Sequence, residues 1–173
     1  MQKIQTLLGH VLIFGLFTLL TQTGGVVWLL CLPLFRVIHS KKTSKWQRFF
    51  FKTTSFSVLY LLLNIFLVPS LAKLQSGRVP LPVFEHLNLK PHQVFYFCVM
   101  NHHYVRPEVK ATCERVADKM AGEFPGTKVY YLDANFPFFN GYPLHPHFTH
   151  RNGTTVDLAL HWQDKKSGKP LDG

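Results

Sequence analysis

The sequence predicts a membrane-anchored α+β protein, with two or three transmembrane segments at the N-terminus and a small α+β domain outside the cytoplasm. Two long apolar blocks, residues 4–35 and 53–72, contain no Lys, Arg, Asp or Glu. Residues 36–52, which lie between them, carry six basic side chains and no acidic one. From residue 95 onward the pattern changes, because short β-rich runs flank one amphipathic helical stretch.

The positive charge is concentrated in the first half of the chain. The 173 residues have a formal net charge of +10. Residues 1–84 contain nine Lys or Arg and no acidic residue, whereas residues 85–173 are nearly neutral, with ten basic and nine acidic side chains. A basic protein can bind nucleic acid, but here the charges are clustered between apolar blocks. This arrangement argues against nucleic acid as a partner and favours membrane lipid.

Residues 53–72 are the clearest membrane span. They form an uninterrupted run of twenty uncharged residues. A helix of about 20 apolar residues is long enough to cross the roughly 30 Å hydrocarbon core of a bilayer.

The first apolar block does not have the length of one simple span. As a single helix, residues 4–35 would be about 48 Å long, whereas two full crossings need roughly 40 residues and a turn. The polar and flexible residues 21–25 divide the block. Three arrangements remain open: one tilted or kinked span, a re-entrant pair, or two short spans. A cleaved signal peptide fits less well, because Lys3 alone precedes an overlong apolar stretch.

The basic segment predicts the orientation of the chain. Segments rich in Lys and Arg between spans stay in the cytoplasm, so we expect residues 36–52 to be cytoplasmic. Trp46 and the run of phenylalanines at 49–51 suit the interface, where aromatic rings sit at the level of the headgroups. The next span then carries the chain outward. We therefore expect an integral protein of the bacterial inner membrane, with residues 73–173 in the periplasm.

The outer segment is expected to begin with a linker and to continue as a small domain. Residues 73–94 contain three prolines and show no helical or strand period, which is typical of a linker. Residues 95–173 are expected to form the domain. Its expected elements are a strand at 96–100, a helix at 107–122, a strand at 128–135, an aromatic loop at 136–147 and a strand at 154–162. Cys98 and Cys113 form a disulfide in an oxidising compartment or remain two buried thiols.

The stretch HFTHRNGTTVDLALHW, residues 147–162, contains the candidate site. The pair Asn152–Gly153 is a strong turn signal, and a turn there folds His150 back toward Asp157. Imidazole and carboxylate together suit zinc. A buried carboxylate also needs a partner, and an Arg, a Lys or a His would serve as well as a metal. The spacing alone leaves both interpretations open.

The string H-x-x-G-x-x-V-D-L, from His150 to Leu158, resembles the zinc motif of a metallopeptidase superfamily. That superfamily contains D-alanyl-D-alanine dipeptidases and carboxypeptidases, murein endopeptidases and the Hedgehog signalling domain. The resemblance covers about residues 96–162 and implies that His150 and Asp157 are two of three zinc ligands. It also implies that Arg106 binds a substrate carboxylate, the alternative being an ordinary surface or capping role. The blocks NHHYVRPEV and YYLDANFPFFNGYPLHPHFTH are similar to those of uncharacterised bacterial membrane proteins.

The chain departs from the family after Asp157. The family takes its third ligand, a second His, from a later strand, with a Glu or similar base three residues before it. The sixteen residues after Asp157 contain no Glu, and their one histidine, His161, follows Asp157 by only four positions. His145, His147 and His161 are local candidates for the missing ligand. His102 and His103 are further candidates, or else a polar strand end.

Two hypotheses about function follow from the match and the departure. In the first, the outer domain corresponds to the N-terminal part of a zinc peptidase domain and is truncated or inactive in this chain. The complete form of such a domain hydrolyses a bond in the peptide of peptidoglycan. In the second, the protein is non-catalytic, and its outer domain binds a cell-wall peptide, a metal or a partner protein.

Overall fold

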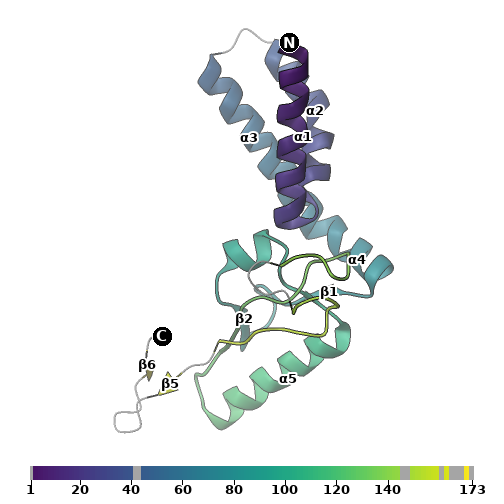
Figure 1. Ribbon diagram of the computed structural model, residues 1–173. Helices are drawn as coiled ribbons and strands as arrows, with labels where there is room; N and C mark the ends of the chain where they lie inside the picture. Colours follow the sequence, from purple (N-terminus) through teal and green to yellow (C-terminus); the bar gives the residue numbers. More distant parts are fainter. Residues whose placement is uncertain (1, 41–43, 145–148, 160–161, 164–169, 172–173) are drawn as a thin grey trace.

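A computed structural model describes residues 2–40, 44–144, 149–159, 162–163 and 170–171. Figure 1 shows a helical bundle standing on a small α+β domain. The bundle is formed by α1 (Gln2–Thr21), α2 (Gly24–Ser40) and α3 (Lys45–Leu62). Helix α3 continues through the π-helix η1 (Leu63–Leu67) into α4 (Val68–Ser76), which leads to the domain.

The first apolar block forms a helical hairpin. Gln22 has a left-handed backbone (φ 62°), and the chain reverses there between α1 and α2. Glycine lets the two helices approach closely, because a Cβ added to Gly25 would overlap Thr18 Oγ1 and lie 2.6 Å from Phe14 O. Of the three arrangements open from the sequence, the single tilted or kinked helix is therefore wrong.

The bundle has the length and surface of a membrane segment. Two of the described helical stretches, Ile4–Thr21 and Lys45–Ser76, are long and apolar enough to cross a membrane, and Gly24–His39 is a shorter apolar helix. Large apolar side chains such as Leu12 and Phe50 point outward and are exposed. Water disfavours so large an apolar surface, whereas lipid tails do not. The structure thus supports the membrane part of the expected fold; which side of a membrane each end faces stays a prediction.

The α+β domain contains short two-stranded pairings and one long helix. Strand β1 (Val79–Pro80) pairs antiparallel with β3 (Tyr104–Val105), and β2 (Leu89–Pro91) pairs parallel with β4 (Val129–Tyr131). A third pair, β5 (Trp162–Gln163) with β6 (Pro170–Leu171), is antiparallel. Helix α5 (Pro107–Glu123) confirms the helix expected at 107–122, and it begins with proline in its first turn.

The centre of the domain is β4 and the residues that follow it. On one side lies β2; on the other lie residues 157–159, bridged at Tyr131 and Leu158. Leu132 N donates to Asp157 O, and Asp157 N donates to Asp133 O, each at 2.8 Å. Leu132 and Asp133 therefore both lie opposite Asp157, and this arrangement is a β-bulge. The bulge interrupts the ladder, and within the described residues the strand expected at 154–162 is present only as this short pairing and as Trp162 in β5.

The apolar core of the domain lies between α5 and the short strands. It is formed by Leu81, Leu89, Val105, Cys113, Ala117, Val129, Tyr131 and Ala134. Cys98 packs against this core, and Cys98 and Cys113 are both free thiols in the structure. Burial raises the pKa of the Cys98 thiol to about 11, so the thiol is protonated at neutral pH.

Two expectations from the sequence are corrected here. Residues 73–94 are not a spacer, because this segment supplies the end of α4, both β1 and β2, and the buried core residues Leu81 and Leu89. Its strands are too short to show a period. The apolar run at 96–100 is not a strand: residues Val94–Val99 form the π-helix η2, which buries Phe97 and leaves Phe95 exposed.

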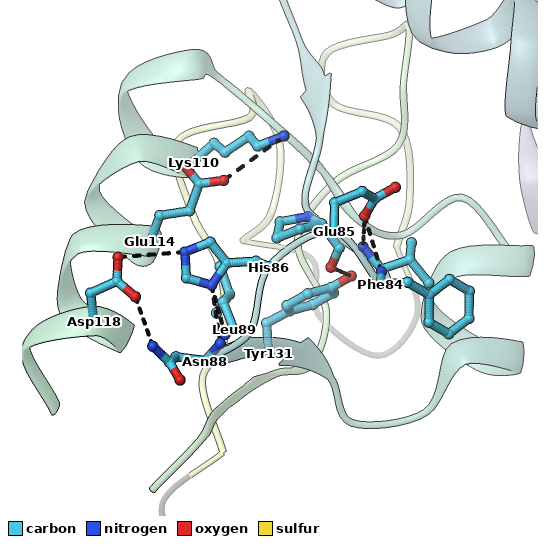
Figure 2. Close-up of polar contacts among 11 residues, drawn as sticks. Phe84, Glu85, His86, Asn88, Leu89, Lys110, Glu114, Asp118 and Tyr131 are labelled. Atoms are coloured by element: carbon cyan, nitrogen blue, oxygen red, sulfur yellow. Dashed lines mark hydrogen bonds and ion pairs between the residues drawn. The ribbon is translucent and has the colours of Figure 1, made fainter. Parts of the chain in front are cut away.

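His86, which is partly buried, links the start of β2 to α5 (Figure 2). His86 Nδ1 accepts hydrogen bonds from the backbone N–H groups of Asn88 (3.2 Å) and Leu89 (3.0 Å). The proton of the neutral ring is therefore on Nε2, which lies 3.6 Å from Asp118 Oδ2. Asn88 Nδ2 donates to the other oxygen of the same carboxylate at 2.8 Å.

Asn101 joins the helical hairpin to the domain. Its side chain is 1 % exposed, and its backbone is left-handed (φ 63°). Its Nδ2 lies 2.7 Å from Asn64 Oδ1 in η1, 3.0 Å from Thr23 Oγ1 and 3.1 Å from Thr21 O. One amide thus contacts both the hairpin turn and the long helix.

Further hydrogen bonds support this junction. Tyr60 OH donates to Val99 O (2.6 Å), and Tyr142 OH donates to Thr18 O (2.6 Å). The backbone N–H of Phe138 donates to Gln22 Oε1 (2.9 Å). The aromatic loop and η2 are therefore both held against the end of the bundle that faces the α+β domain.

Asn101→Gly tests the junction, because glycine keeps the left-handed backbone and removes only the amide. We expect the free energy of unfolding in detergent to fall by about 1–3 kcal/mol, since buried groups of the hairpin turn lose a partner. Asn88→Gly is the matched control and removes a surface hydrogen bond, so its loss should be clearly smaller. Equal losses would show that the Asn101 amide does not hold the junction.

Candidate functional site

The turn predicted at Asn152–Gly153 is present and is tied to the start of α5. Gly153 has φ +82°, and Asn152 Oδ1 accepts hydrogen bonds from Thr154 N (3.2 Å) and Thr154 Oγ1 (2.6 Å). Gly153 O accepts from Arg106 N at 2.8 Å. The turn therefore has a defined position, and it folds His150 back toward the segment that contains Asp157.

His150 and Asp157 lie next to each other, as the sequence predicted. His150 Nε2 is 3.2 Å from Asp157 Oδ1; the imidazole is 2 % exposed and the carboxylate 33 % exposed. The other ring nitrogen, Nδ1, lies 2.6 Å from Ala134 O. A carbonyl oxygen can only accept, so Nδ1 carries a proton and donates it to Ala134.

This hydrogen bond determines what His150 presents to Asp157. With Nδ1 protonated, a neutral imidazole has a lone pair on Nε2, and an ionised carboxylate has only acceptor oxygens. Two acceptors at 3.2 Å repel each other, so the contact calls for a cation between them or a proton on one of them. The pair of His86 with Asp118 differs, because there Nε2 carries the proton (Figure 2).

The distance between the two groups also fits two ligands of one metal ion. Zinc–nitrogen and zinc–oxygen bonds of about 2.0–2.2 Å in a tetrahedral site place the donor atoms about 3.4 Å apart. Nε2 and Oδ1 are 3.2 Å apart. A carbonyl that accepts from Nδ1 is also the usual outer contact of a metal-binding histidine.

A second His–Asp pair lies nearby. His102 Nδ1 is 2.9 Å from Asp133 Oδ1, and both side chains are buried. Ala134 N donates to His102 O at 2.7 Å, while Ala134 O accepts from His150. The dipeptide Asp133–Ala134 therefore contacts both histidines. Sequence reasoning did not assign Asp133, because nothing in the local pattern distinguishes it from an ordinary strand-end residue.

The described residues contain no group of three His, Cys, Asp or Glu side chains placed to hold one metal ion. His145, His147 and His161, the local candidates for a third ligand, lie outside the described residues. His102 and His103 directly precede β3, as expected of a polar strand end, and both are buried.

Two arginines flank the turn. The exposed Arg106, predicted to bind a substrate carboxylate, places its Nε 3.3 Å from Asn152 O, beside the hairpin that carries His150. Arg78 is buried, and its guanidinium donates to Phe136 O and Asn140 Oδ1. Burial, and then the nearby charge of Arg106, lower the pKa of Arg78. Arg78 was missed because it lies in the segment interpreted as a linker.

A groove of about 380 Å³ lies between α5 and residues 154–158. Thr154, Val156 and Leu158 line it. Side chains alternate along an extended segment, and Asp157 faces His150 instead. The groove is therefore on the opposite face from the His–Asp pair.

Comparisons with known proteins return no match. No protein-family model matches the chain, and neither the curated proteins nor the solved structures contain a match. The resemblance to zinc peptidases therefore stays a prediction that rests on the residues quoted above.

Gly153→Ala tests the packing of the turn on Arg78. A Cβ at Gly153 would lie 2.9 Å from Arg78 Nε, and φ is +82°. Arg78 cannot move aside easily, because backbone carbonyls hold its guanidinium. We expect a loss of about 2–4 kcal/mol in unfolding free energy.

Two glycines of the domain provide controls for this change. Gly141 has φ +70°, and a Cβ added there would meet nothing within 4 Å, so Gly141→Ala should cost only about 1 kcal/mol. Gly122, in α5, is also open, and alanine there should be neutral or slightly stabilising. If Gly153→Ala cost no more than Gly141→Ala, the contact with Arg78 would not constrain the turn.

His103 predicts a dependence of stability on pH. Its side chain is buried, and desolvation lowers its pKa to about 4 from the usual value of 6.5. Between these two values the unfolded chain binds more protons than the folded chain, so stability rises with pH. We expect a gain of about 3 kcal/mol from about pH 4 to about pH 6.5. Thermal unfolding of His103→Gln across this range should be correspondingly less pH-dependent; an unchanged profile would contradict the assignment.

Proposed function

We propose that this chain is an integral membrane protein whose outer domain binds zinc through His150 and Asp157 and is related to peptidases that act on cell-wall peptides. The observation that supports this most directly is the hydrogen bond from His150 Nδ1 to Ala134 O. It leaves Nε2 facing Asp157 Oδ1 at 3.2 Å, which is the tautomer and the spacing that a metal ion requires.

The proposed topology follows from the arrangement in Figure 1. The C-terminal end of α2 and the N-terminal end of α3 lie at the end of the bundle away from the α+β domain. The basic segment 36–52 includes both of these ends. If it is cytoplasmic, as the positive-inside rule predicts, the domain lies in the periplasm.

The residues of the site have distinct proposed roles. Zinc, when bound, polarises a carbonyl and activates a water molecule. His150 and Asp157 hold it, and the carbonyl of Ala134 orients the imidazole. Arg106 is exposed beside the turn, where a guanidinium can bind the terminal carboxylate of a peptide through two hydrogen bonds.

A second candidate function is a non-catalytic binding protein. A distance of 3.2 Å also fits a direct hydrogen bond from a protonated imidazole to Asp157. The pair would then be a partly buried ion pair that holds the hairpin closed. The outer domain would bind a cell-wall peptide or a partner protein without hydrolysing it.

The zinc content of the purified full chain distinguishes these functions. We expect close to one zinc ion per chain after dialysis, and loss of most of it in His150→Ala and in Asp157→Asn, because each removes one ligand. His86→Ala is the matched control: it breaks another His–Asp contact but should leave the zinc content unchanged.

Activity then separates catalysis from binding. Zinc-loaded protein that releases D-alanine from a peptide ending in D-Ala-D-Ala would support the peptidase, and Arg106→Ala should raise KM more than it lowers kcat. Zinc without hydrolysis would favour a metal-binding protein without peptidase activity. Wild-type protein that retains no zinc would exclude the metal and support the ion pair.

A further inference from the structure

We propose that a cavity at the junction of the bundle and the α+β domain binds one hydrocarbon chain of a membrane phospholipid. The cavity has a volume of about 340 Å³ and lies between α1, α3 and η2. This inference rests on the proposed insertion of the bundle into a membrane, but it does not depend on zinc or on peptidase activity.

The walls of the cavity are apolar on all three sides. Phe17 and Leu20 come from α1, Phe56 and Leu61 from α3, and Phe95 and Val99 from η2. None of the lining residues is charged. A peptide or a nucleotide would lose its hydrogen bonds to water here without gaining others, whereas a hydrocarbon chain has none to lose.

The polar groups at the inner end of the cavity already have partners. Tyr60 OH donates to Val99 O at 2.6 Å. Thr21 Oγ1 donates to Phe17 O (2.9 Å) and accepts from Gly24 N (2.8 Å). The hydroxyls of Tyr60 and Thr21 are therefore used within the protein, and Ser57 adds a single hydroxyl to a lining that is otherwise apolar.

The position of the cavity identifies the occupant as a lipid. Helix α1 has 20 residues and is therefore about 30 Å long, the thickness of the hydrocarbon core. The cavity lies beside its last turn, at the level of the outer leaflet in the proposed topology. Leu20, Leu61 and Phe95, the last of them 70 % exposed, connect the cavity with the apolar outside of the bundle. A chain from the surrounding leaflet can enter sideways without crossing water.

The test uses the full chain in vesicles of phosphatidylethanolamine and phosphatidylglycerol that contain a phospholipid with a diazirine in the middle of one acyl chain. After illumination, we expect the labelled peptides to contain residues 95–100 or 56–61. Ser57→Phe places an aromatic ring at the cavity wall and should reduce this labelling about fivefold, the effect of losing about five to ten carbon–carbon contacts between the acyl chain and the wall. Val58→Phe is the matched control, because Val58 is the exposed neighbour of Ser57 and does not line the cavity; its labelling should match wild type.

Four results would overturn the proposal. Labelling spread evenly over α1, α2 and α3, and equal in both variants, would show only the lipids that surround any membrane helix. Loss of this labelling as the ratio of protein to lipid is raised would show that a second chain covers the cavity. Release of the protein from the vesicles by alkaline carbonate would refute membrane insertion itself, whereas retention without labelling would refute the lipid site alone.

Discussion

The contact of the Asn101 amide with the hairpin turn and with Asn64 is the interaction on which the arrangement of bundle and domain depends. The contact is buried, where a hydrogen bond is electrostatically stronger than in water. The Asn101 amide nitrogen takes part in it, whereas Asn101 Oδ1 is buried without a partner among the described residues. Asn101 also determines where its neighbours lie. Its left-handed backbone ends η2 and directs the next residue, His102, toward Asp133. The junction with the bundle and the contact of His102 with Asp133 therefore both depend on Asn101.

Both π-helical turns of the described chain lie at this junction. Such turns are rare and are often found near functional positions. In η1 the wider turn contains Asn64, whose side-chain amide donates to Tyr60 O and whose oxygen meets Asn101. In η2 the wider turn exposes Phe95 beside the bundle while Phe97 packs inward. The π-helical geometry therefore has two effects. In η1 it places Asn64 against Asn101, and in η2 it leaves an apolar space between η2 and α3.

The parts of the molecule that could be predicted from the sequence are those with a local signal. The long apolar helix over residues 53–72 follows from the length and lack of charge of that segment. Helix α5 follows from its helical period and Pro107, and the turn follows from Asn152–Gly153. Contacts between distant segments have no such signal. Arg78 meets residues 136–140, and Asp133 meets His102, only after the chain has folded. The strands of residues 73–94 are two or three residues long, too short to show an alternating pattern, so a core segment resembled a linker.

The two described contacts of Nε2 with a carboxylate show why a sequence motif alone does not define a metal site. His86 and His150 each place Nε2 near an Asp, at 3.6 Å and 3.2 Å. At His86, Nδ1 accepts hydrogen bonds from two backbone N–H groups, so the proton of the ring is on Nε2. This proton faces the carboxylate of Asp118, and the contact needs no cation. At His150 a carbonyl occupies Nδ1, so Nε2 can accept a metal ion or must take up a second proton. The backbone oxygen of Ala134 therefore determines which nitrogen of His150 carries the proton. Ala134 directly follows the bulge at Leu132 and Asp133, which sets the course of the backbone at this point. The tautomer of His150, and with it the lone pair on Nε2 that faces Asp157, is therefore a property of the fold around β4. We expect a chain that keeps the motif but loses the bulge to lose this arrangement.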